Sequence, residues 1–141
     1  MKRFRPKLDK LFWIISSILL AIVIGITVTA IFMPITLWVI IPTDLFILYF
    51  VLSPLFGYVE LREKTVFIKF GFFLSREIPY SKIRGTESVR KFYSDSMLSL
   101  KNSLDHVNIK YNTFDMVSVS VKDNDELIRK IEQNRKQNLT Y

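Results

Sequence analysis

The sequence predicts a membrane-anchored α+β protein, in which a transmembrane helical hairpin precedes a small antiparallel sheet and a C-terminal helix. Three observations carry this prediction. Residues 11–59 include one charged residue, Asp44. Apolar and polar residues then alternate in several short segments, and a helix-start signal follows at Asp123. We therefore divide the 141 residues into a membrane anchor, 1–57, and a polar domain, 58–141.

The apolar stretch is long enough for two membrane crossings. A helix needs about 20 apolar residues to cross a bilayer, and one straight helix over the whole stretch would reach roughly 70 Å, far beyond a hydrocarbon core of about 30 Å. We place the spans at about 12–32 and 35–56, with Met33 and Pro34 at the outer turn. Pro34 suits a helix start, where its missing N–H costs nothing.

Pro42 and Asp44 leave the outer end of the second span open. In one alternative Ile41–Asp44 lies at the outer interface, and Thr43 or Asp44 caps a short returning helix. An ionised carboxylate in hydrocarbon costs at least about 2.5 kcal/mol, which favours the capping position. As a buried acid, Asp44 would contact a peptide or a partner helix. A proton relay has little support, because neither span holds Lys, Arg, His or a second acid.

Charge favours a cytoplasmic location for both ends of the hairpin. Basic flanks stay in the cytoplasm, and the chain has a net charge of +7. Two crossings leave both basic flanks inside, whereas a single crossing, the alternative, moves one of them across. A signal peptide is a further alternative, although the apolar run 11–33 exceeds an ordinary signal core of about 7–15 residues. The N-terminal residues expected to fix topology and bind lipid headgroups are Lys2, Arg3, Arg5, Lys7 and Lys10.

The first half of the polar domain has the period-two pattern of short strands. Val66, Ile68 and Phe70 alternate with more polar neighbours, and a turn at 63–65 joins them to the preceding strand. Pro79 ends an extended segment or marks a sheet edge. The expected elements are strands at 58–63, 66–72, 75–78 and 85–93, and a polar loop at 94–103.

The second half carries the strongest strand signals. Val107, Ile109 and Tyr111 share one face of an expected strand, and His106, Asn108 and Lys110 share the other. In the matching strand Val117, Val119 and Val121 alternate with Ser118 and Ser120, which predicts one packed side and one side in water. The expected hairpin consists of strands 104–111 and 117–121 and a turn at 112–115.

A short amphipathic helix is expected to cover the sheet. Asp123 is a fitting N-cap, and Glu126 follows three residues later as in a capping box. Leu127, Ile128 and Ile131 form its apolar stripe. Basic residues 135–136 complement the helix dipole, and we expect 138–141 to fray.

Signals of catalysis are lacking in the sequence. Without cysteine there is neither a disulfide nor a thiolate metal site. His106 has no acid or nucleophile at a fixed local spacing, so we expect a solvated surface residue. Nucleotide-loop and hydrolase motifs are also missing, and the acidic run 123–126 lacks the spacing of a calcium loop. We therefore expect no enzyme, no catalytic or metal-binding residues and no cofactor.

A second basic group lies in the polar domain and is a candidate for binding a protein or anionic lipid, although a solvated face is the simpler interpretation. Nucleic acid is a weaker partner, because the domain has no recognition helix or stacking motif and its basic residues alternate with acids. The candidate binding residues are Asp44, Lys82, Arg84, Arg90 and Lys91.

Three short motifs occur in a distinctive order. Phe4-Arg5-Pro6-Lys7-Leu8-Asp9 precedes the apolar hairpin, Ile78-Pro79-Tyr80-Ser81-Lys82-Ile83 follows it, and Val119-Ser120-Val121-Lys122-Asp123 leads into the last helix. In this order the chain resembles the bacterial PH-like membrane proteins, and among them immunity proteins against the glycosylated peptide bacteriocin sublancin. The resemblance covers nearly the whole chain, although Met97 and Leu98 stand where many members have a Pro-Ala pair.

The resemblance implies a PH-like sheet or barrel closed by the C-terminal helix and held at the cytoplasmic face of a bacterial cell membrane. It further implies a bacteriocin immunity protein that protects the producer cell by binding a sublancin-like glycopeptide or its membrane target. The alternative is a general membrane-tethered adaptor, whose PH-like domain binds a protein or anionic lipid.

Overall fold

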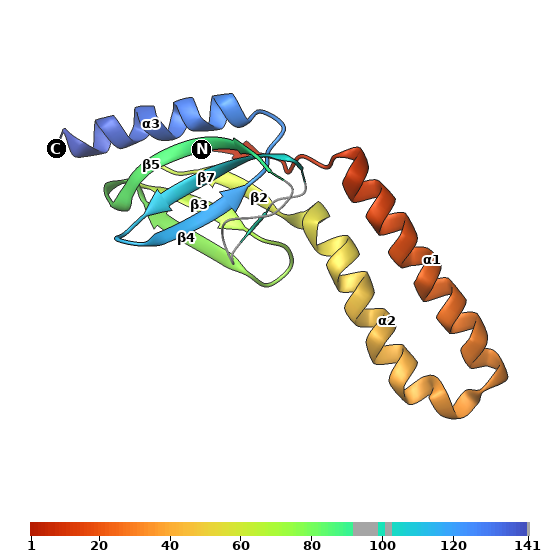
Figure 1. Ribbon diagram of the computed structural model, residues 1–141. Coiled ribbons are helices and arrows are strands. Elements are labelled where there is room, and N and C mark those ends of the chain that lie inside the picture. Colours follow the sequence, from red (N-terminus) through yellow and green to blue (C-terminus); the bar gives the residue numbers. More distant parts are fainter. Residues whose placement is uncertain (92–98, 101–102, 141) are drawn as a thin grey trace.

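The computed structural model describes residues 1–91, 99–100 and 103–140. An antiparallel pair of apolar helices projects from a domain of two sheets and a C-terminal helix, as expected for the fold class (Figure 1). The strands are β1 (Lys2–Phe4), β2 (Tyr58–Leu61), β3 (Thr65–Lys69), β4 (Ser75–Pro79), β5 (Ile83–Arg90), β6 (Ser99–Leu100), β7 (Asp105–Tyr111) and β8 (Asp115–Val119). The helices are α1 (Lys10–Phe32), α2 (Leu37–Leu52) and α3 (Asn124–Leu139), with 3₁₀ turns η1 (Pro34–Thr36), η2 (Ser53–Phe56) and η3 (Tyr80–Lys82).

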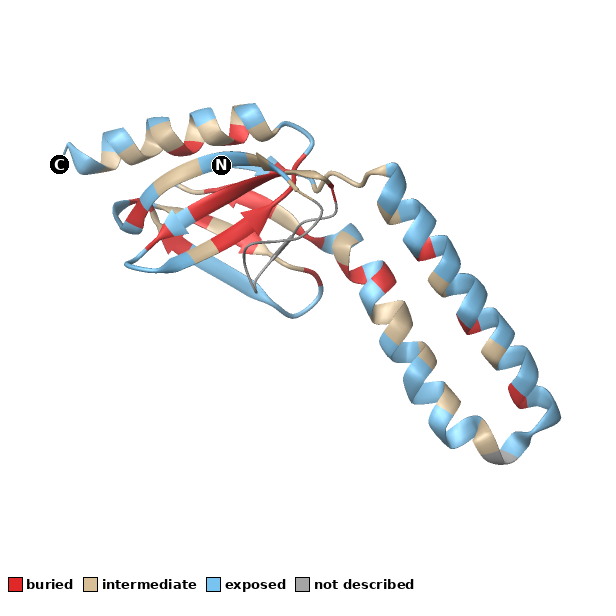
Figure 2. Cartoon of the chain, in the orientation of Figure 1, coloured by how far each residue is buried: buried red, intermediate tan, exposed pale blue. Residues whose placement is uncertain are grey.

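The two apolar helices lie side by side and expose most of their surface (Figure 2). Both α1 and the segment formed by α2 and η2 are long and apolar enough to cross a membrane. The buried residues of α1 are Ser16, Val23 and Ala30, which recur at seven-residue intervals and so share one helix face. Small residues at such a seam let two helices approach closely. Most of the remaining helix surface is apolar and exposed.

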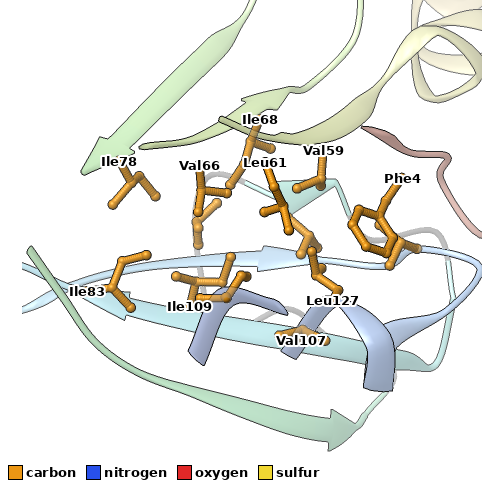
Figure 3. Close-up of a cluster of buried hydrophobic side chains, with 14 of the residues drawn as sticks. Phe4, Val59, Leu61, Val66, Ile68, Ile78, Ile83, Val107, Ile109 and Leu127 are labelled. Atoms are coloured by element: carbon orange, nitrogen blue, oxygen red, sulfur yellow. The ribbon is translucent and has the colours of Figure 1, made fainter. Parts of the chain in front are cut away.

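The domain consists of two four-stranded sheets. One has the strand order β1-β2-β3-β4 and is antiparallel throughout. The other has the order β5-β7-β8-β6, in which β6 pairs parallel to β8. Their apolar faces meet in one core, which Figure 3 shows in close-up. The fully buried residues at its centre include Val59, Val66, Ile68, Ile109, Val117, Val119, Leu127 and Ile131.

Helix α3 fastens the two sheets together. Asp123 caps it, since the Glu126 N–H donates to Asp123 Oδ1 at 2.9 Å, while the Glu126 carboxylate forms an ion pair with Lys2. The Asn134 amide donates to the buried Tyr80 hydroxyl at 2.9 Å on one side. On the other side Thr86 of β5 donates to Glu132 at 3.1 Å. The helix continues through Leu139 and so includes residues 138 and 139, where the sequence predicts fraying, while residue 141 lies outside the described residues.

The N-terminal arm belongs to the sheet domain, whereas the sequence analysis assigns it to the membrane anchor. Phe4 of β1 pairs with Val59 of β2 and enters the core. The chain then crosses to the second sheet, where the Lys7 N–H donates to the Ser120 carbonyl at 3.0 Å and the Lys122 N–H donates to the Arg5 carbonyl at 3.1 Å. The helical pair is therefore an insertion between two neighbouring strands of one sheet.

Two further differences concern strand ends. The strand expected to reach residue 72 ends at Lys69, because Gly71 adopts φ 137° and the Phe70 N–H donates to the Leu74 carbonyl in a tight loop. The expected turn at 112–115 is confirmed in part, with Asn112 at φ 50° and Asp115 already in β8. Residues 92–93 of the fourth expected strand, and the loop residues 94–98 and 101–102, lie outside the described residues.

Most of the polar face of the β7–β8 hairpin is buried, contrary to expectation, while Lys110 is exposed. His106 is fully buried rather than solvated, and its Nδ1 lies 3.2 Å from the Leu104 carbonyl. Ser118 donates to Asn108 Oδ1 at 2.7 Å, and Ser120 donates to the Asp105 carbonyl at 2.9 Å. Buried polar groups are tolerated when they have hydrogen-bond partners, which these contacts supply to both serines and to Asn108. His106 Nε2, in contrast, is buried and has no hydrogen-bond partner among the described residues. Period-two alternation identifies the two faces of a strand but does not reveal what covers them.

Candidate functional site

Asp44 lies inside α2 and not at a helix end. The helix begins at Leu37, runs through Pro42, and has Thr36 as its N-cap residue, so the capping interpretation of Asp44 and Thr43 is wrong. The Thr27 hydroxyl of α1 hydrogen-bonds with Asp44 Oδ2 at 2.7 Å. The second carboxylate oxygen, Oδ1, is buried and has no hydrogen-bond partner among the described residues. Asp44 thus forms a polar link between the two apolar helices.

Three of the N-terminal basic residues form ion pairs within the domain. Arg3 Nη2 lies 2.8 Å from Glu60 Oε2, and its guanidinium stacks on the Tyr58 ring with 4.3 Å between the charge and the ring centroid. Lys2 pairs with Glu126, and Lys7 lies 3.5 Å from Asp105. For Arg5 and Lys10, both exposed, the described residues include no acidic partner.

Glu60 is the centre of a charge network on the first sheet. It is 7% exposed and accepts from Arg3 on one side and from Arg62 at 3.2 Å on the other. These two guanidinium groups hold the pKa of the Glu60 carboxyl below its usual value. Arg62 also reaches Glu77 at 3.1 Å, and the Thr65 hydroxyl donates to the same Glu77 oxygen. The hydrogen bond from Thr65, and then the one from Arg62, lower the pKa of Glu77.

The four basic residues of the polar domain do not form one cluster. Lys82 and Arg84 lie at the start of β5, while Arg90 and Lys91 lie at or beyond its end, about 20 Å away at roughly 3.3 Å per residue. Arg90 is 3.7 Å from Asp105, which also contacts Lys7 of the N-terminal arm. The Arg90 end therefore adjoins the base of the helical pair, whereas the Lys82 end points away from it (Figure 1).

A pocket of about 220 Å³ lies at the Lys82 end, between β4 and the end of β7. Arg76 and Lys82 bring two positive charges to it, and neither has an ion-pair partner in the part of the chain that the structure describes. Glu77 is the acid of the pocket, and Arg62 and Thr65 already engage it. The lining residues are Arg76, Glu77, Ile78, Pro79, Lys82, Tyr111 and Asn112.

The surroundings of the pocket suit an extended ligand with an acidic group. The guanidinium of Arg76 lies 5.8 Å from the Tyr111 ring centroid, which holds the side chain over the pocket. Strand β4 is the edge of its sheet in the described part of the chain, so its outer N–H and C=O groups have no neighbouring strand there. An added strand pairs with such an edge while a nearby pocket receives one side chain. Sequence reasoning found Lys82 but missed Arg76, because the two meet only in the folded chain.

A second feature missed by sequence reasoning is an aromatic contact between the β3–β4 loop, residues 70–74, and the end of the helical pair. Phe72 packs on Phe56 with ring centroids 4.7 Å apart. Phe73 stacks on Tyr49 of α2 at 6.1 Å, with the rings 15° from parallel. The uninterrupted apolar run from Phe70 to Leu74 was the available signal, since a half-exposed strand alternates and this run does not.

A family model described as bacterial PH domain matches residues 57–135, which is more than half of the chain. The match spans β2 to most of α3 and does not include β1 or the helical pair. No curated protein and no solved structure gives a significant match.

Replacing Glu60 by Gln tests the charge network. Because Arg3 and Arg62 lower the Glu60 pKa, its stabilising effect is complete above the ordinary carboxyl pKa of about 4.3 and is lost as the pH falls through the lowered value. We expect Glu60→Gln to lower the thermal unfolding midpoint of the detergent-solubilised chain by about 5 °C at pH 7, with the difference shrinking as the pH falls below the ordinary carboxyl pKa.

Glu63→Gln is the matched control, since Glu63 is exposed and its carboxylate has no ion pair within the described ranges. We expect its unfolding midpoint to match that of the unmodified chain. Equal midpoints for Glu60→Gln and Glu63→Gln at pH 7 would contradict the stabilising role of the network.

Proposed function

The chain belongs to the bacterial PH domain family, and on this premise we propose that it is a non-enzymatic adaptor anchored in the bacterial cell membrane. Helices α1 and α2 cross the bilayer, and the PH domain lies at the cytoplasmic face. The exposed apolar surface of both helices supports this anchoring, because such a surface is unfavourable in water. Trp13 at the domain end and Trp38 at the outer end lie where aromatic residues favour the membrane interface.

The proposed partner is a protein segment that carries an acidic side chain. The single observation behind this proposal is the pocket with two cations, Arg76 and Lys82, that have no ion-pair partner among the described residues. The position of the pocket favours a protein partner and not the lipids of the anchoring bilayer. Tyr111, which lines the pocket, ends β7, and Asp105 at the other end of that strand contacts the N-terminal arm next to the helical pair. The two ends of β7 are about 20 Å apart at roughly 3.3 Å per residue. A pocket of about 220 Å³ suits one side chain or one anionic group.

A second candidate is the more specific role of a bacteriocin immunity protein that binds a sublancin-like glycopeptide or its membrane target. The order of the three sequence motifs favours it. Two of these motifs lie against each other, with Pro6 bridged to Val121, and the third supplies Ile78, Pro79 and Lys82 to the pocket. These contacts give the motifs a shared structural role, which is compatible with both candidates.

Single cysteines test the membrane arrangement, because the chain has no cysteine of its own. We expect a membrane-impermeant maleimide added to spheroplasts to label Met33→Cys at the outer turn. Phe114→Cys, in the turn between β7 and β8, should react only after the membrane is opened. Labelling of both sites from the same side would contradict two crossings, and the reverse pattern would contradict the cytoplasmic location.

Peptide binding tests the adaptor. Fluorescence anisotropy with the detergent-solubilised full chain should show binding of acidic peptides and not of the same peptides with Gln and Asn in place of Glu and Asp. The double variant Arg76→Ala/Lys82→Ala should weaken this binding at least about tenfold, because each lost charged hydrogen bond is worth about 1.5–3 kcal/mol.

The matched control for this test removes two exposed basic residues elsewhere, Lys122→Ala/Arg129→Ala, and should bind as the unmodified chain does. Equal loss in both double variants would indicate net charge alone and overturn the pocket assignment. Binding to vesicles with anionic lipid that falls with Arg90→Ala/Lys91→Ala, without peptide binding, would support a headgroup ligand and contradict the proposed protein partner.

Survival of sensitive cells tests the immunity role. Cells that express the chain should withstand a sublancin-like glycopeptide, because the membrane-anchored domain would bind the toxin or its target. Killing by an unrelated pore-forming peptide should stay unchanged, and cells with an empty vector provide the baseline. Undiminished killing by the glycopeptide, with the chain detected in the membrane fraction, would exclude this candidate.

A further inference from the structure

The β3–β4 loop carries consecutive exposed apolar side chains. Phe73 is 84% exposed and Leu74 is 57% exposed, while Phe72 is partly covered by its ring contacts. Residues 70–75 include no charged side chain, so their transfer out of water involves no ionic desolvation. Consecutive exposed apolar side chains of this kind mark a contact with a membrane or another protein.

The loop is held against the end of the helical pair by a close backbone approach. The Ser53 hydroxyl of η2 donates to the Phe70 carbonyl at 3.4 Å. A Cβ on Gly71 would lie 1.8 Å from Ser53 Oγ, so the absence of a side chain permits this approach, and the φ of 137° favours glycine as well. The loop therefore has a defined position relative to η2 and α2.

The ring contacts fix how far the loop extends along the helix. Phe72 packs on Phe56, the last residue of the second span, and Phe73 stacks on Tyr49. Tyr49 lies seven residues before Phe56, which is about 10 Å at roughly 1.5 Å per residue. In a bilayer crossed by the segment Leu37–Phe56, Phe73 therefore lies at the depth of the interface and the adjoining acyl chains.

From this geometry we propose that the β3–β4 loop, residues 70–74, inserts into the same bilayer that α1 and α2 cross. This inference rests on the proposed membrane anchoring. The apolar surface of the loop contacts lipid and not a protein, because Phe72 and Phe73 pack on residues of a membrane span, whose other neighbours in a bilayer are lipids. Insertion gives the domain a third point of attachment besides α1 and α2, and three points fix its orientation on the membrane surface.

Depth-dependent quenching in reconstituted vesicles tests this inference on the full chain. Single cysteines at Phe73, Leu74, Phe114 and Ile22 are labelled with the NBD fluorophore, and the variants are placed in phosphatidylcholine/phosphatidylglycerol vesicles that contain lipids with a nitroxide at acyl position 5 or 12. Phe114 is the matched control for Phe73, since both are phenylalanines in hairpin turns and their side chains are 92% and 84% exposed. Ile22 lies in the middle of α1 and reports membrane crossing.

We expect the label at Phe73→Cys and Leu74→Cys to be quenched at least twofold more by the position-5 nitroxide than by position 12. The label at Ile22→Cys should show the reverse preference, and the label at Phe114→Cys should resist both quenchers. Quenching at Ile22→Cys without quenching at Phe73→Cys or Leu74→Cys would overturn loop insertion and leave the anchor intact. Absence of quenching at Ile22→Cys would instead overturn the proposed anchoring.

Discussion

The pairing of β1 with β2 is the constraint on which the arrangement of the whole chain depends. Residues 5–57 connect these neighbouring antiparallel strands, so the helical pair begins and ends at the same end of the β1–β2 pair. Burial of Phe4 contributes about 1.5–3 kcal/mol, and beside it the exposed Arg3 forms an ion pair with the buried Glu60. The conformational entropy lost on closing this long connection is smaller when its two helices are antiparallel, because they already bring the strand ends together.

The same pairing changes the meaning of the N-terminal charges. A basic segment before an apolar run is typical of a membrane flank, yet Lys2, Arg3 and Lys7 are used within the fold. The two roles are compatible, because an N-terminal segment that forms ion pairs with the domain lies on the same side of a membrane as the domain. Arg76 and Lys82 differ from these residues, because they have no acidic partner among the described residues and line the same pocket.

Local patterns predicted the elements that depend on neighbours in sequence. The two apolar helices, the β7–β8 hairpin and the Asp123 cap follow from composition, alternation and capping, which are properties of a few adjacent residues. Strand β1 could not be predicted in this way, because three residues with two cations resemble a strand only when the distant β2 is present. The burial of His106 and the position of Asp44 inside α2 likewise depend on how distant segments assemble.

The candidate site shows the same limit more strongly. The sequence singled out Lys82, but only the fold shows that Arg76 lines the same pocket. Arg90 lies far from Lys82, because the extended strand β5 separates the two residues. In the β3–β4 loop, Phe72 continued the alternation of β3 in sequence, while the φ of Gly71 ended the strand. Binding surfaces combine residues from several elements, so their composition follows from topology.

The division of the first sheet across the helical pair also sets an order of events during synthesis. The ribosome releases β1 long before β2 exists, so Phe4 has no core to enter until the second helix has been made. Completion of the sheet therefore waits for the returning helix to deliver Val59 beside Phe4. A nascent chain whose helices fail to turn back cannot pair β1 with β2, so folding of this domain depends on the return of the second helix.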